Sequence, residues 1–175
     1  MRSWVILALA VAACDKPGSS AVRDGTDTTS AATASVAVTD AERQRMEQAV
    51  NDWIKLTMNQ WEQGDSAALM GTYPSSGPLV SAGNGELTTS RDSVAGMLAG
   101  LSQTSDRKTS YQNPKIDVLA PGVAAVTLAF RFEGKQPDKK PFNNAGVYSA
   151  VLAERDGKLQ IVQEHQSMLP APKKK

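Results

Sequence analysis

The sequence contains one cysteine, Cys14, and one histidine, His165. A single cysteine excludes a disulfide within the chain, and these two residues without clustered carboxylates supply no credible ligand set for zinc or calcium. Acidic and basic residues nearly balance, with 19 Lys and Arg against 18 Asp and Glu, which argues against nucleic acid as a partner. A glycine-rich phosphate loop is also missing. We therefore expect no metal, no cofactor and no nucleic acid.

The chain also lacks an apolar run of about 20 residues, the length that a membrane-spanning helix needs. Its N-terminus instead has Arg2 and then a shorter apolar stretch, residues 4–13, which is typical of a secretory signal. The end of this stretch, Val11-Ala12-Ala13-Cys14, resembles the lipobox of bacterial lipoproteins, in which the cysteine is lipidated. The alternative is an ordinary signal peptide or an incidental buried cysteine.

A lipidated Cys14 predicts a protein of the cell envelope that is held at a membrane by its acyl chains. Asp15 slightly favours retention at the inner membrane, by resemblance to the sorting signal of enteric bacteria. The residues after it are rich in Ser, Thr, Ala, Gly and Asp and contain no aromatic residue, which predicts a flexible tether. The expected organisation is a signal peptide (1–13), the lipidated cysteine and tether (14–37), a folded domain (38–169) and a basic tail (170–175).

Helical periodicity dominates the first part of the predicted domain. Thr39 followed by Glu42 is a capping-box pattern, and apolar residues then recur at helical spacing as far as Trp61. Gly64 is a C-terminal cap residue, so the pattern predicts a helix from about Asp40 to Gln63. A short helix through residues 67–70 and a third helix that begins after Ser90 follow.

After Ser102 the apolar period changes to two, which is typical of strands. Four successive strands are expected, at Lys108–Leu119, Val123–Glu133, Phe142–Glu154 and Leu159–Ser167. Helices followed by an antiparallel meander indicate an α+β domain. We expect a strongly curved antiparallel sheet that wraps around the long N-terminal helix as a cone-shaped barrel and encloses a cavity at its open end.

The turn Asp156-Gly157 between the last two strands is a strong signal for a two-residue hairpin. A regular hairpin at this turn places Leu152 opposite Ile161 and Tyr148 opposite His165. One face of the pair is then apolar near the turn and polar at the far end, as in the wall of a pocket. The opposite face, which carries Val147, Ser149, Val151, Val162 and Glu164, is expected to be the outer surface of the sheet.

Several segments together resemble the SnoaL-like branch of the nuclear transport factor 2-like superfamily, which is also described as cystatin-like. They are the long helix with two Trp residues, the run Gly64-Asp65-Ser66-Ala67-Ala68-Leu69, the helix start Ser90-Arg91-Asp92, and the ending Glu164-His165-Gln166-Ser167. The resemblance covers about residues 39 to 168 and implies a pocket between the first helix and the sheet, and a homodimer packed through the sheet. Gln163 stands where many relatives carry a second histidine, so a histidine pair is absent.

Tyr148 and His165 are the candidate catalytic residues, because histidine is the residue type that exchanges protons most readily near neutral pH. The alternative is a structural histidine that is satisfied by a neighbour. Glu164 is the nearest carboxylate in the sequence, but in a regular strand it points to the opposite face and cannot orient His165. The residues expected to line the pocket and bind a ligand are Trp53, Tyr73, Tyr111, Phe130, Tyr148, Gln163, His165 and Ser167.

Three functions remain open. The first is a membrane-anchored pocket domain that binds a small apolar or amphipathic molecule without catalysis. The second is a protein-interaction or dimerisation module that uses the outer face of the sheet. The third is a proton-transfer enzyme, such as an isomerase, cyclase or dehydratase, that uses His165 with Tyr148. The missing carboxylate partner for the histidine makes catalysis the weakest of the three.

Overall fold

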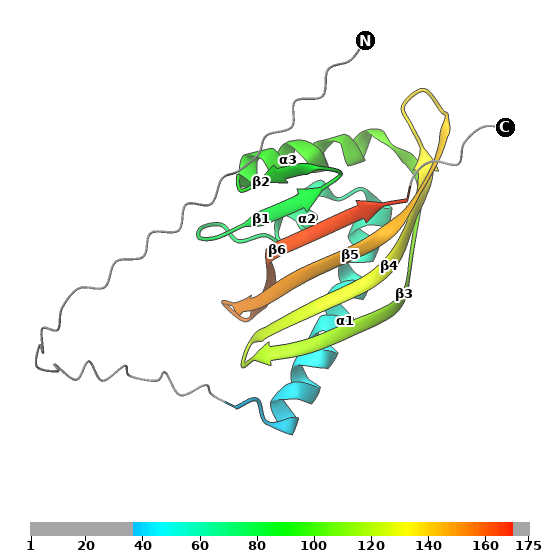
Figure 1. The fold of residues 1–175 in the computed structure, drawn as a ribbon. Coiled ribbons are helices and arrows are strands. Elements are labelled where there is room, and N and C mark those ends of the chain that lie inside the picture. The colour runs from blue at the N-terminus through cyan, green and yellow to red at the C-terminus, as the bar shows by residue number, and fades with distance from the viewer. Residues whose placement is uncertain (1–36, 170–175) are drawn as a thin grey trace, which may run out of the picture. The chain divides into compact units, whose positions relative to one another are not determined.

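The computed structural model describes residues 37–169. The predicted signal peptide, the lipidated Cys14, nearly all of the tether and the basic tail lie outside the described residues. Within them, helices and strands alternate before a meander of long strands (Figure 1). The elements are α1 (Asp40–Gln63), α2 (Ser66–Met70), β1 (Val80–Gly83), β2 (Glu86–Thr88), α3 (Arg91–Ala99), a 3-10 helix η1 (Gly100–Gln103), β3 (Ser105–Ala120), β4 (Val123–Lys135), β5 (Pro141–Arg155) and β6 (Lys158–Met168).

The long helix α1 begins and ends where the sequence predicts. The side chain of Thr39 accepts a hydrogen bond from the backbone N–H of Glu42 at 3.2 Å and so caps the first turn. At the other end Gly64 has a φ of 70°, and its N–H bonds to the carbonyls of the last turn. No helix within residues 37–169 has both the length and the apolar character that crossing a bilayer requires.

The strands form one six-stranded sheet in the order β2-β1-β6-β5-β4-β3. Strands β3 to β6 make the predicted antiparallel meander, and the long strands bend around α1, which lies across one face of the sheet (Figure 1). The short strand β1 pairs with β6 in parallel. The sequence does not predict this pair, because a strand of four residues carries too little periodic signal to assign a partner. The α+β class, with a curved sheet and a long N-terminal helix, is confirmed.

The β5–β6 hairpin turns at Asp156 and Gly157, which both have positive φ, at 52° and 71°. Leu152 lies opposite Ile161, as predicted. Beyond that pair a β-bulge inserts one extra residue in β6, so that Val151 lies opposite Gln163 and Val162 has no partner.

The bulge reverses the faces of the rest of β6. Tyr148 lies opposite Gln166, and His165 lies opposite Ser149 on the outer face. The predicted pairing of Tyr148 with His165 is therefore wrong. The physical reason is that alternate side chains of a strand point to opposite faces, so one inserted residue exchanges every side chain beyond it. Glu164, predicted on the outer face, points inward and is 8% exposed.

The core lies between α1 and the inner face of the sheet. Strand β4 contributes Ala124, Val126 and Leu128, which are 0%, 1% and 1% exposed and alternate as the sequence predicts. Helix α1 contributes Met46 and Val50, both 0% exposed. Burial of these apolar side chains fixes the distance between the helix and the sheet, and with it the space that remains further along the same face.

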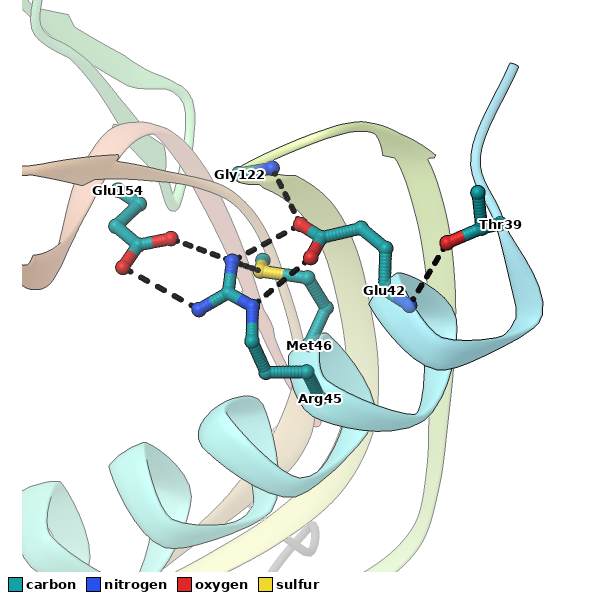
Figure 2. Close-up of polar contacts among 6 residues, drawn as sticks. All are labelled: Thr39, Glu42, Arg45, Met46, Gly122 and Glu154. Carbon is teal, nitrogen blue, oxygen red and sulfur yellow. Dashed lines mark hydrogen bonds and ion pairs between the residues drawn. The ribbon is translucent and has the colours of Figure 1, made fainter.

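A polar cluster joins the first turn of α1 to the far ends of β3, β4 and β5 (Figure 2). Arg45 lies between two carboxylates, at 2.9 Å from Glu42 and 2.7 Å from Glu154. Glu42 also accepts a hydrogen bond from the backbone N–H of Gly122 in the β3–β4 turn at 3.1 Å. The hydrogen bonds from Arg45 and Gly122 lower the pKa of Glu42. This cluster fixes the end of the domain that is away from the cavity described below.

Candidate functional site

A cavity of about 620 Å³ lies between α1 and the sheet, and α3 and the β1–β2 hairpin border it as well. A volume of this size suits a small organic ligand, because ligand sites in proteins measure about 300–1,000 Å³. Most of the side chains that line it are apolar or aromatic. They include Ile54, Met58, Trp61, Leu69, Val94, Leu98, Leu128, Phe130, Phe132 and Ile161.

One carboxylate, Glu164 of β6, stands in this apolar wall and accepts three hydrogen bonds from hydroxyl groups. Its Oε1 accepts from the Tyr73 hydroxyl at 2.8 Å and from the Ser81 hydroxyl at 2.7 Å. Its Oε2 accepts from the Tyr148 hydroxyl at 2.8 Å. All four residues line the cavity. Three donors on one buried carboxylate satisfy its oxygen atoms and hold it in one orientation. We call these four residues the Glu164 cluster.

Three separate elements bring the hydroxyl groups to Glu164. Ser81 lies on β1, directly beside Glu164 in the parallel pairing, and Tyr148 lies on the neighbouring strand β5. Tyr73 follows α2 and is held through its backbone. The guanidinium group of Arg91 donates to the carbonyl oxygens of Met70, Tyr73 and Pro74 at 3.0, 2.8 and 2.9 Å. These bonds fix the segment from which the Tyr73 ring reaches the carboxylate.

The two phenols of the cluster keep their protons over the ordinary range of pH. Burial raises the pKa of Tyr73, and the negative charge of Glu164 raises it further. The same two causes raise the pKa of Tyr148 well above its usual value. Both rings therefore act as hydrogen-bond donors to Glu164 and not as phenolates.

The structure brings together half of the residues that the sequence predicts for the pocket. Trp53, Tyr73, Phe130 and Tyr148 line the cavity. The other four do not belong to its lining. Tyr111 packs against the core from the edge strand β3, and Gln163, His165 and Ser167 lie exposed on the outer face of β6. The last three were assigned to the pocket because a regular hairpin was assumed, and the bulge reverses their direction.

Two residues of the cluster, Ser81 and Glu164, are missed by the sequence analysis. Glu164 is assigned there to the outer face for the reason just given, and Ser81 lies in a strand too short to orient from its pattern. No signal in the sequence marks the bulge at Val162. A buried acidic residue is identified only when its partners are known, and those partners come from three distant segments. Among residues 37–169, no group of three or more His, Cys, Asp or Glu could hold a metal ion.

No family model matches the sequence, and no curated protein matches it. Solved structures do. A candidate scytalone dehydratase from Novosphingobium aromaticivorans has a TM-score of 0.69 at 12% identity, over 75% of this chain and 89% of that one. A ketosteroid isomerase-like protein from Erwinia carotovora atroseptica has a TM-score of 0.60 at 15% identity, over 71% and 96%. An NTF-2 like protein of unknown function from Shewanella oneidensis has a TM-score of 0.54 at 19% identity, over 69% and 98%.

The chain has the nuclear transport factor 2-like fold. At these identities the likeness concerns the fold alone, and the site residues must be argued from this chain. Within the nuclear transport factor 2-like fold, the space between the first helix and the sheet is where the cavity and the Glu164 cluster lie.

Proposed function

We propose that this protein is anchored in the cell envelope through a lipidated Cys14 and binds a small apolar or amphipathic molecule in its cavity, without catalysis. The observation that supports binding is the cavity itself, about 620 Å³ in volume, with a mostly apolar wall and one fixed polar centre. Such a site gains free energy from apolar burial and orientation from a few polar contacts.

The proton-transfer hypothesis loses the residue pair on which it rests. His165 is exposed on the outer face of β6, and Tyr148 faces the cavity, so the two side chains lie on opposite sides of the sheet. The buried carboxylate of Glu164 lies next to His165 in the sequence but on the other face, so it cannot orient the imidazole. Two of the structural neighbours are described as dehydratase and isomerase types, and a fold of this kind supports both binding and catalysis.

Extraction of the purified protein tests binding. The full chain is isolated from the envelope of cells that express it, and its small molecules are extracted into organic solvent and identified by mass spectrometry. We expect a compound present in molar proportion to the protein. A matched pair of variants locates it: Gln166→Trp fills the cavity, and Gln163→Trp adds the same side chain on the outer face. The compound should be lost only from Gln166→Trp, and its retention in both variants contradicts the proposal.

The anchor is tested separately by growth with a labelled fatty acid. The wild-type chain should carry the label and sediment with membranes, and Cys14→Ser should lose both properties. The physical reason is that more than one acyl chain is needed for stable anchoring, and all of them depend on this residue. A Cys14→Ser chain that still carries the label would show that the lipid is attached elsewhere or that the label is not specific.

A second role is supported by the outer face of the sheet. Small and apolar side chains gather at its centre, where Ala129 pairs with Val147 and Ala125 pairs with Val151. Val147 is 45% exposed. A sheet face with small and apolar side chains at its centre packs well against a second sheet. We propose that two copies of the chain associate through this face, which leaves both cavities free.

A further inference from the structure

Glu164 is a buried negative charge that no positive side chain within residues 37–169 pairs with. It is 8% exposed, and none of the ion pairs among residues 37–169 includes it. Buried charges in proteins are ordinarily paired, because removal of a carboxylate from water is costly. Here three neutral hydroxyl groups stabilise the carboxylate, and its net charge remains at the wall of the cavity.

The Glu164 cluster offers acceptors to the cavity and no free donor. The protons of Tyr73, Ser81 and Tyr148 are all directed at the carboxylate, so the remaining capacity of each hydroxyl oxygen is to accept. The carboxylate itself has about four lone-pair sites and uses three of them. A ligand group that contacts this cluster must therefore donate hydrogen bonds.

The rest of the lining does not offset this charge. Among residues 37–169, Arg131 is the one cation that borders the cavity. Its guanidinium bonds to Asn143 at 2.8 Å and pairs with Glu133 at 3.7 Å, both on the outer face of the sheet. Glu86 adds a second negative charge to the lining. The indole N–H of Trp53 is enclosed by protein atoms and is not offered to the open space. The electrostatic potential of the cavity therefore favours a positive group.

Aromatic rings stand around the same space and can contact a cation through their faces. Trp53, Trp61, Phe130 and Phe132 line the cavity, and the rings of Trp61 and Phe132 meet edge to face at a centroid distance of 5.4 Å. Aromatic faces attract ammonium groups, most strongly where water is excluded. An apolar wall with aromatic rings and one buried carboxylate, Glu164, thus suits an alkyl or aryl amine.

We propose that the ligand of this cavity carries a hydrogen-bond-donating cation, a primary or secondary ammonium group, on an apolar body, and that the cavity discriminates against carboxylates and phosphates. The ammonium group binds at Glu164, where it donates hydrogen bonds to the free lone pair of the carboxylate and to the hydroxyl oxygens. The apolar body lies along the wall formed by α1 and α3. This inference rests on the proposed function, since it assigns the chemical class of ligand for the same cavity.

Three probes of equal chain length test the charge preference: decylamine, decan-1-ol and decanoate, at neutral pH. Binding is measured by isothermal titration calorimetry to the full chain carrying Cys14→Ser, which carries no acyl chains at residue 14. We expect decylamine to bind at least about tenfold more tightly than decanoate, with decan-1-ol between them. Decanoate binding as tight as decylamine overturns the inference.

Two variants then assign the preference to Glu164. In Glu164→Gln the decylamine affinity should fall about tenfold and the decanoate affinity should not fall, because the side chain loses its charge at nearly constant volume. In Glu47→Gln, the matched control at a carboxylate of α1 that does not line the cavity, the preference should persist. A Glu164→Gln protein that folds and keeps the wild-type ratio overturns the assignment. The N-terminal segment is the same in every protein, so binding of probes to it cancels in the comparison.

Tyr148→Phe gives a second route that leaves the charge in place. It removes one hydroxyl donor from Glu164, so the preference for decylamine over decanoate should be kept or increased, and a reversed preference contradicts the inference. The failure of the two proposals is distinguishable. If none of the three probes binds and no compound is extracted from the wild-type chain, the proposed function fails. If all three bind equally, the cavity binds ligands and only the charge preference fails.

Discussion

Glu164 and His165 are neighbours in the sequence, and their side chains lie on opposite faces of the sheet. Glu164 is 8% exposed and faces the cavity, and His165 is exposed on the outer face. The extra residue Val162 decides this arrangement, because it changes which side chains of β6 point inward. His165, the candidate catalytic residue of the sequence analysis, thus lies outside the cavity. The neighbouring carboxylate, Glu164, is the polar centre of the cavity wall.

This relationship predicts different costs for the two substitutions. Glu164→Ala removes the acceptor of three buried hydroxyls, so the free energy of unfolding should fall by about 2 kcal/mol. His165→Ala changes an exposed side chain and should alter it by less than about 0.5 kcal/mol. Urea denaturation followed by circular dichroism measures both values. Equal effects of the two substitutions would contradict the register described above.

The phenols of the Glu164 cluster predict a loss of stability in alkali. Folding raises the pKa of Tyr73 and Tyr148 above the ordinary tyrosine value of 10.0, so above that pH the unfolded chain releases protons that the folded chain retains. The contribution of these two phenols to the free energy of unfolding is then complete below about pH 10, and it falls as the pH rises beyond that value. Urea midpoints between about pH 8 and about pH 12 measure the slope.

Variants of the three tyrosines separate this effect from other alkaline changes. The double variant Tyr73→Phe and Tyr148→Phe should show a shallower decline, because its unfolded state has fewer protons to release. Tyr111→Phe, which changes the tyrosine outside the cluster, is the control and should keep the wild-type slope. If the urea midpoint falls equally with pH in all three proteins, the tyrosines of the Glu164 cluster are not the cause of the alkaline loss of stability.

Two glycines predict opposite results for the same substitution. A Cβ atom on Gly146 of β5 would lie 2.0 Å from the backbone oxygen of Ser167 on β6, and one on Gly96 of α3 would meet no atom within 4 Å. Gly146→Ala should therefore destabilise the protein by about 1–3 kcal/mol, because the strands must separate. Gly96→Ala should stabilise it by up to about 1 kcal/mol, since alanine is the better helix former.

Thermal unfolding of the two glycine variants gives the comparison directly. The melting temperature should fall for Gly146→Ala and rise or stay unchanged for Gly96→Ala. A Gly146→Ala protein as stable as the wild type would show that β5 and β6 are further apart at this point than the structure places them.

The proposed association through the outer sheet face predicts a dimer in solution. Val147→Lys places a charge at the centre of that face and should give a monomer in sedimentation velocity experiments. Leu56→Lys is the matched control, because Leu56 is 55% exposed on α1 and Val147 is 45% exposed on β5. A wild-type monomer, or dissociation by both substitutions, would exclude this face as the interface.

Several features of the protein follow from local sequence alone. The caps at Thr39 and Gly64 set the limits of α1, and the alternation along Ala124, Val126 and Leu128 identifies the core face of β4. The turn at Asp156 and Gly157 fixes where the last hairpin reverses. Each depends on residues within a few positions of one another, where helix capping, turn geometry and the period of apolar residues act directly.

The composition of the cavity wall was decided by tertiary structure. The parallel pairing of β1 with β6 brings Ser81 to Glu164, and Arg91 holds the segment that presents Tyr73. These contacts join segments far apart in the chain, and a single bulge at Val162 determines which side of β6 takes part. Local patterns do not encode such an insertion, because the free energy of the bulge depends on the contacts that it creates across the sheet. A buried carboxylate is stable here only because three hydroxyl groups from other elements donate hydrogen bonds to it.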